Sequence, residues 1–226
     1  MASRGVIGHA CSMANSSRGI VSAVLIAGFL TLCVTVLRLV GELQGWNPAL
    51  FSKEAGGGGA LVGVGWLPIV IGLWFGRRLV QQGHVPPSTL RAALVALVGA
   101  AAMMGSIVYV ATNTPNEQLM ERMGVFMACC PLFLLVAWFA WGRAALAGLL
   151  YGILARVPVV VVQYVAIANN WGTHYEKVNP ALGELDAAAR GEALMMAQML
   201  FWVPFTTLLV VFFAALGALT VRKRPA

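Results

Sequence analysis

Long apolar stretches follow one another along most of the chain, separated by short polar connections. A helix needs roughly 20 predominantly apolar residues to cross a hydrocarbon core about 30 Å thick. Backbone polar groups in lipid must be satisfied within the segment, which favours helices. The pattern therefore predicts an all-α fold: a polytopic integral membrane bundle of six transmembrane helices, forming a single domain over residues 1–226. The predicted spans are 20–41, 60–78, 89–112, 122–141, 144–168 and 194–220.

The longest polar connection, residues 169–193, lies between the last two predicted spans. Asn179 followed by Pro180 is typical of the cap and first position of a helix. We therefore expect an outer loop that contains a short interfacial helix. Trp171, His174 and Glu176 belong to the first part of this loop, where they could form a lid over the outer end of the bundle.

Charged residues are distributed unevenly between the two sets of loops. With six spans, nine of the fifteen Lys and Arg residues fall on the side of both termini, and all eight acidic residues fall on the other side. Positive loops favour the cytoplasmic side, so both termini are predicted to be cytoplasmic in a plasma (inner) membrane. The nine are Arg4, Arg18, Arg77, Arg78, Arg91, Arg143, Arg222, Lys223 and Arg224. The eight are Glu42, Glu54, Glu117, Glu121, Glu176, Glu184, Asp186 and Glu192.

The composition supports the membrane class and limits the partners. The 226 residues are 60% hydrophobic and 10% charged, against about 25% charged in soluble domains. The net charge of +7 is explained by topology and by attraction to anionic lipid, and no nucleic-acid partner is expected. Membrane lipids are the expected partners. Small-residue pairs, Gly72 with Gly76 and Gly148 with Gly152, would also permit close packing within the chain, in a homo-oligomer or against another membrane protein.

One permanent cation, Arg156, stands in the middle of the predicted span 144–168. A helix turns about 100° per residue, so Gly152 and Gln163 lie on the same side as Arg156, with valines opposite. We expect Arg156 to face the bundle near the membrane midplane. A charge at that depth needs a partner or water, and the predicted spans contain no interior acid to supply one.

Two other predicted spans carry polar stripes in their outer halves. Thr31, Thr35, Arg38 and Glu42 share one helical face near the end of the first span. The third span has Ser106 and Tyr109 in a similar stripe that ends at Asn113. The inner halves of the spans are nearly free of polar side chains. This asymmetry indicates a polar cavity that opens to the outside.

The leading hypothesis is that an anionic or amphipathic small molecule or lipid is bound or transported through this cavity. Arg156 would supply the counter-charge at the midplane and Arg38 would attract the ligand at the mouth. The other candidate ligand-binding residues are Gln163, Thr35, Tyr109 and Ser106. An internal hydrogen-bond network that holds the helices together explains the same polar stripes without a ligand.

Three alternatives remain open at this stage. The chain could be a non-catalytic accessory or structural subunit of a membrane complex. It could be a membrane enzyme in which His174 and Glu176 act on a lipid-linked substrate. It could handle Cu(I), which thioethers suit, because methionines cluster in the outer portions of the spans. The chain matches no catalytic, metal or cofactor signature, so no catalytic residue, metal ligand or cofactor is predicted. The methionines are Met103, Met104, Met120, Met123, Met127, Met195, Met196 and Met199.

Overall fold

The computed structural model describes the backbone of residues 3–57 and 60–221 and the side chains of residues 19–56 and 60–221. Every regular element in these ranges is a helix, which confirms the all-α class. The side chains of Arg4, Arg18 and residues 222–224, which contribute to the predicted orientation, lie outside the described residues. The α-helices are α1 (Ser3–Leu43), α2 (Leu67–Gln81), α3 (Thr89–Asn113), α4 (Asn116–Cys129), α5 (Phe133–Asn169), α6 (Ala187–Met196) and α7 (Val203–Leu219).

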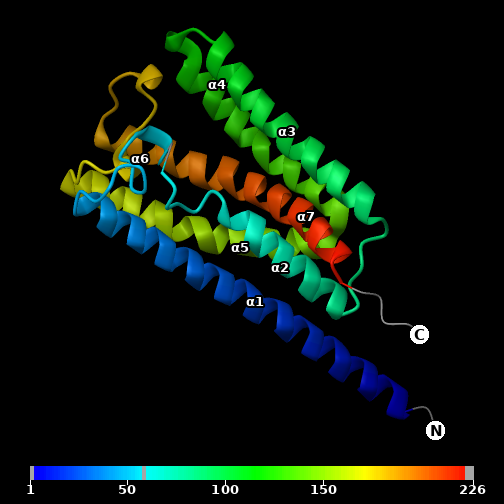
Figure 1. Ribbon diagram of the computed structural model, residues 1–226. Coiled ribbons are helices and arrows are strands. Elements are labelled where there is room, and N and C mark those ends of the chain that lie inside the picture. Colours follow the sequence, from blue (N-terminus) through cyan, green and yellow to red (C-terminus); the bar gives the residue numbers. More distant parts are fainter. Residues whose placement is uncertain (1–2, 58–59, 222–226) are drawn as a thin grey trace.

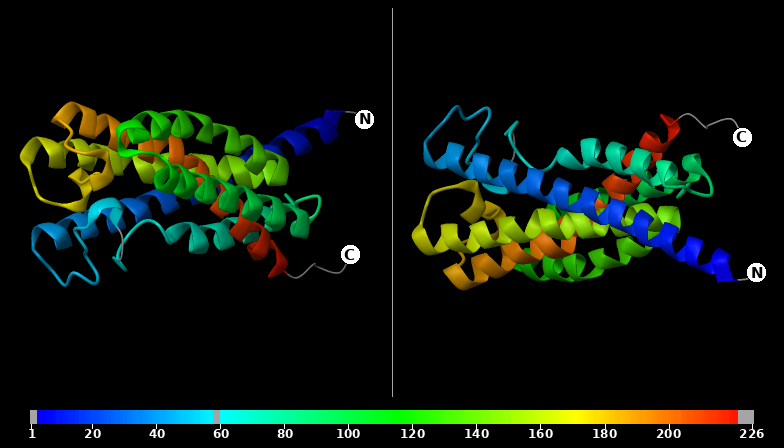
Figure 2. Two further views of the ribbon diagram at one scale, coloured as in Figure 1. Left: turned by 90° about the horizontal axis from the view of Figure 1, so that it is seen from above. Right: turned by 90° about the horizontal axis from the view of Figure 1, so that it is seen from below.

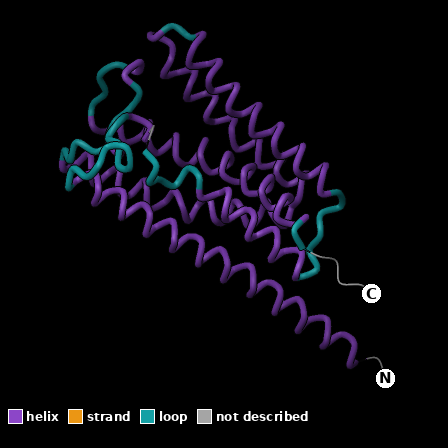
Figure 3. Tube along the Cα trace, viewed as in Figure 1, coloured by secondary structure: helices purple, strands orange, loops and turns teal. Residues whose placement is uncertain are grey.

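Helix α7 lies in the middle of the bundle and packs against α2, α3 and α5. Helix α1 covers one face, and α3 with α4 covers the opposite face (Figures 1 and 2). The connecting segments gather at the two ends of the bundle, as the tube in Figure 3 shows. The end that carries residues 44–57, 60–66 and 170–186 is called the loop end below.

Four segments are long and apolar enough to cross a membrane, where the sequence predicted six spans. They are Gly19–Leu43, Thr89–Asn113, Asn116–Asn169 and Ala187–Leu219. The predicted fourth and fifth spans both lie in Asn116–Asn169, as two helical arms joined at Trp141, whose backbone is extended (φ −163°, ψ 92°). The chain turns back at Trp141. Trp141 to Arg143 lie beside residues 83–85, which connect α2 to α3 at the end of the bundle opposite the loop end (Figure 1).

The predicted second span is only partly helical. Helix α2 begins at Leu67, with Pro68 in its first turn, and has 15 residues. At 1.5 Å per residue it is about 22 Å long, shorter than a hydrocarbon core. Residues 60–66 enter the bundle without helical structure because Gly63 and Gly65 weaken a helix and Pro68 suits its first turn. The uninterrupted span predicted for 60–78 is therefore wrong in its first third.

Glycines bring α2 and α5 close to the central helix α7. A Cβ on Gly72 would lie 3.0 Å from the Val210 carbonyl oxygen, and one on Gly148 would lie 3.2 Å from the Val210 side chain. Gly152 makes a similar approach to α7, and Gly76 makes a closer one. The small-residue pairs in the sequence therefore serve packing within the chain.

Candidate functional site

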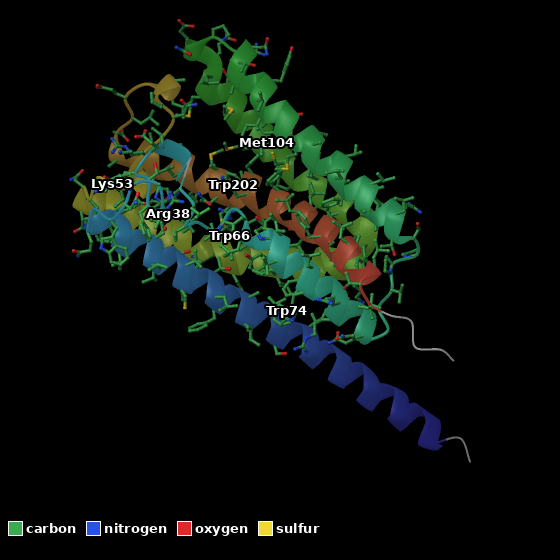
Figure 4. All side chains as sticks on the ribbon, viewed as in Figure 1. Arg38, Lys53, Trp66, Trp74, Met104 and Trp202 are labelled. Atoms are coloured by element: carbon green, nitrogen blue, oxygen red, sulfur yellow. The ribbon has the colours of Figure 1, made fainter. Side chains whose placement is uncertain are left out.

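A cavity of about 890 Å³ opens at the loop end of the bundle. Its walls come from α1, residues 55–56 and 60–66, α4, α5, the 174–182 part of the outer loop, and α6 with the turns that follow it. Figure 4 labels three of its lining side chains, Arg38, Trp66 and Trp202. The volume lies in the range of roughly 300–1,000 Å³ that is typical of small-molecule sites.

Arg156 lines the inner part of this cavity and is 6% exposed. Its Nη1 donates a hydrogen bond to Gln198 Oε1 at 3.1 Å, and its guanidinium carbon lies 4.9 Å from the centre of the Trp202 ring. Its Nε is buried and has no hydrogen-bond partner. Among the described residues, no carboxylate lies within ion-pair distance of Arg156. The predicted orientation toward the bundle is confirmed, and the direct contacts of the guanidinium with described residues are with an amide and an indole.

The two residues that contact Arg156 come from a π-helix, Ala197–Trp202, between α6 and α7. Pro204 follows this segment and has no N–H to give to the carbonyl one turn earlier, which loosens the regular helical pattern. Single π-helical turns within α-helices are frequent at functional sites. The distortion places Gln198 and Trp202 on the cavity side, where both meet Arg156.

Gln163 lies seven residues after Arg156 on α5 and also lines the cavity. The side chain is 4% exposed, and its Oε1 has no hydrogen-bond partner. Leaving a buried amide oxygen unpaired costs on the order of 1–3 kcal/mol. Gln163 and Arg156 thus both line one cavity, and each has a buried polar atom without a partner, a need that a polar ligand or ordered water would meet.

The polar stripe of α1 is only partly a lining surface. Thr35 is buried beside the outer loop: its hydroxyl donates to the Thr31 carbonyl at 3.0 Å, and its own carbonyl accepts from the Tyr175 hydroxyl at 3.2 Å. Thr35 does not line the cavity, in contrast to the predicted role. Arg38 does line it, and its Nη2 donates to the Ser52 carbonyl at 3.2 Å.

Glu42 is fully buried at the end of α1 and was not predicted as a site residue. It accepts from Arg38 Nε at 2.8 Å, from the backbone N–H of His174 at 2.9 Å and from the His174 imidazole. The spacing of Arg38 and Glu42, four residues apart on one helix, is the sequence signal for their ion pair. The contact with His174 has no such signal, because 132 positions separate the two residues.

The outer loop covers the cavity, but its predicted lid residues act separately. Glu176 is buried and accepts from the backbone N–H groups of Trp171 and Gly172, so it holds a turn. His174 pairs with Glu42 and lines the cavity, whereas Trp171 packs against a small apolar cluster and does not. The structure therefore gives no His174–Glu176 pair. The predicted interfacial helix is one 3₁₀ turn, Pro180–Leu182, capped by the Asn179 side chain.

Ser106 and Tyr109 lie outside the cavity. Both side chains are exposed, Tyr109 to 68%. The inward face of α3 carries Met103 and Ile107 instead, and Ile107 is the α3 residue that lines the cavity. The prediction that this stripe of α3 faces a cavity was wrong. Mildly polar side chains near the end of a membrane helix occur on cavity faces and on faces exposed at the membrane interface, and the sequence does not distinguish the two.

The charges that line the cavity have a positive excess. Arg38, Arg156 and Lys177 face one acidic lining residue, Glu192. Glu42 behind the lining neutralises Arg38, so Arg156 and Lys177 together exceed the charge of Glu192 by one. An anion would therefore find complementary charge in this cavity, with its most buried contact at Arg156.

The described residues that could bind a metal ion include no cluster of His, Cys, Asp and Glu, but they include a group of methionines. In the described ranges, no three His, Cys, Asp or Glu side chains gather closely enough to hold a metal ion. Met120, Met123, Met127 and Met196 line one side of the cavity, and we call them the methionine wall. Met195 instead accepts a hydrogen bond from the Tyr164 hydroxyl at 3.8 Å. The methionines that cluster in the sequence therefore contribute unequally to the cavity.

We expect the docking of the outer loop to weaken in acid. Burial lowers the pKa of His174 below its usual 6.5, and Arg38 and Lys177 add to this, against the opposite effect of Glu42. A lowered pKa means that the undocked loop binds a proton first, so docking is fully stable above about pH 6.5 and weakens as the pH falls toward the lower value. The protection of the amides of residues 170–186 against hydrogen exchange, taken relative to the intrinsic exchange rate at each pH, should fall in acid. In His174→Gln, which cannot titrate, this loss of protection should disappear; if it persists, another group is responsible.

The fold and cavity define the class of protein only broadly: an all-helical chain with four segments able to cross a membrane and a cationic cavity at one end. Compared with known proteins, the chain matches no protein-family model, no curated protein and no solved structure. The functional argument therefore depends on the geometry of the cavity.

Proposed function

We propose that this chain is a multi-pass membrane protein that binds, and moves or presents, an anionic or amphipathic small molecule in the cavity around Arg156. The observation that carries this proposal is the guanidinium of Arg156, which is buried, lies in a cavity and has a free Nε and no acidic partner among the described residues. A buried cation without a counter-charge is costly, so a bound anion would stabilise it. Carboxylate and phosphate groups match the planar donor array of arginine.

The proposal includes an orientation with the loop end outside the cell and both termini in the cytoplasm of a plasma (inner) membrane. The turns at residues 83–85 and 141–143 lie side by side at the end opposite the loop end, and the second of them carries Arg143. The loop end carries the acidic side chains of residues 42–54 and 176–192. This charge difference supports a cytoplasmic position for the Arg143 end. Six crossings follow if α2 and residues 60–66 together make one broken crossing, with irregular backbone lining the cavity.

The test measures binding of decyl phosphate, a soluble anionic amphipath, to the purified chain in mild detergent by calorimetry. We expect the wild type to prefer decyl phosphate over uncharged decyl maltoside, and Arg156→Gln to bind decyl phosphate at least about tenfold more weakly, as for a lost charge-assisted contact. Arg122→Gln is the matched control, because Arg122 is exposed and hydrogen-bonds only Gln118. A thermal melt of each variant checks folding.

Two results would overturn the proposal. One is a wild type that shows no preference for the anion, which needs no variant and so holds even if Arg156→Gln fails to fold. The other is a folded Arg156→Gln that binds decyl phosphate as well as Arg122→Gln does. In that case Arg156 would have a structural role, and the accessory-subunit alternative would be favoured.

A further inference from the structure

The cavity has two chemically different parts. Arg156, Gln163 and Gln198 form a polar inner part, and the methionine wall (Met120, Met123, Met127 and Met196) forms an apolar side. Aromatic contacts join the two parts. The ring centres of Phe126, on α4, and Phe201 are 6.3 Å apart, and Trp202, the residue after Phe201, lies against the guanidinium of Arg156. A ligand that reaches both parts must itself carry a charged end and an apolar end.

Helix α4 meets α6 only loosely beside the methionine wall. A Cβ on Gly124 would have one neighbour within 4 Å, the terminal carbon of Met196 at 3.9 Å. Met120 is 38% exposed at the same edge, and Val125 is 62% exposed on the outer side of α4. Between Gly124 and Met196 the surface between α4 and α6 is therefore apolar and is closed by flexible methionine side chains, which adapt readily to different apolar shapes; Glu192 lines the cavity one helical turn before Met196.

We infer that the ligand of this cavity is a membrane lipid with an anionic headgroup, bound with its phosphate at Arg156 and an acyl chain along the methionine wall between α4 and α6. This inference rests on the proposed anion site and adds the ligand class and the route to the bilayer. A soluble anion would use Arg156, Gln163 and Lys177 but would leave the methionine wall without a role. With the bundle in a membrane, the edge at Met123 and Met127 would face acyl chains, and a lipid entering there would reach Arg156 without crossing the outer loop.

Gly124 offers the sharpest test of this route. A phenylalanine at position 124 would project toward Met196 and fill the space between α4 and α6, while Arg156 and the outer loop would stay unchanged. Val125→Phe is the matched control, because it adds the same ring one residue away on the exposed side of α4. Met123→Glu is a second variant, which places a negative charge on the wall without adding bulk.

The experiment reconstitutes the full chain in phosphatidylcholine nanodiscs that contain phosphatidylglycerol with a photoreactive diazirine on one acyl chain. We expect labelling of α4 and α6 peptides in the wild type, competed by plain phosphatidylglycerol and not by phosphatidylcholine. Gly124→Phe and Met123→Glu should lower this labelling about tenfold, Val125→Phe should not, and Gly124→Phe should still bind glycerol phosphate, an anion without an acyl chain, in detergent.

The outcomes separate the two proposals. If both wall variants are labelled as strongly as the wild type, the lipid route is wrong, while unchanged glycerol phosphate binding keeps the anion site. If phosphatidylcholine competes as well as phosphatidylglycerol, the headgroup assignment is wrong. If neither lipid nor decyl phosphate depends on Arg156, the proposed function fails together with the lipid inference.

Discussion

Gly76→Val is expected to destabilise the bundle strongly, because Gly76 marks the closest approach of α2 to the central helix. A Cβ there would lie 2.6 Å from the carbonyl carbon of Ala214 and nearer still to its oxygen. These atoms belong to the backbone of α7, so no side chain can move aside. Overpacking of a core costs about 1–3 kcal/mol, and a rigid backbone contact places this variant at or above the upper value.

The measurement is the midpoint of thermal unfolding in detergent, together with the elution profile on size exclusion. Gly105→Val is the matched control, since Gly105 is also inside a long helix and a Cβ there would meet nothing within 4 Å. Both variants change helix propensity equally, so the difference between them isolates the collision with α7. Equal midpoints for the two variants would mean that α2 and α7 do not pack this closely in solution.

The same packing explains which parts of the fold were predictable from sequence. Helix α3 begins at Thr89 as predicted, because Ser88 caps it by accepting from the Arg91 N–H at 3.3 Å. Such signals are local, and the buried position of Arg156 follows from equally local helical spacing. The span predicted from residue 60 was wrong at its start. Residues 60–66 are apolar, but Gly63, Gly65 and Pro68 disfavour a helix before Leu67.

The rest of the candidate site depends on contacts between distant segments. Glu42 and His174 are brought together by the packing of the outer loop on α1, and no spacing rule connects them. Gln198 and Trp202 reach Arg156 through a π-helix that periodicity at 3.6 residues per turn does not reveal. Ser106 and Tyr109 were misplaced because the direction of a weak stripe depends on which helices surround it. Whether Arg156, Gln163 and Arg38 bind a ligand stays a prediction.

Glu42→Gln is expected to release the outer loop from α1. The carboxylate of Glu42 is fully buried and joins Arg38, on its own helix, to the backbone and imidazole of His174. A glutamine keeps the size of the side chain but removes the charge, and its NH₂ group replaces one of the two acceptor oxygens. Breaking a buried ion pair in this way costs on the order of 3–5 kcal/mol, because Arg38 loses its carboxylate partner while it stays buried.

This loss should be concentrated in the segment that depends on Glu42. Amide hydrogen exchange and limited proteolysis of residues 170–186 should both accelerate, while the amides of α7 should keep their protection. Glu54→Gln removes the same charge from an exposed side chain and is the matched control. Since His174, Tyr175 and Lys177 line the cavity, release of the loop would also widen its polar mouth without touching Arg156. Unchanged protection in Glu42→Gln would show that the loop is held by Glu176 and Tyr175 alone, and that the cavity is covered independently of the charge on α1.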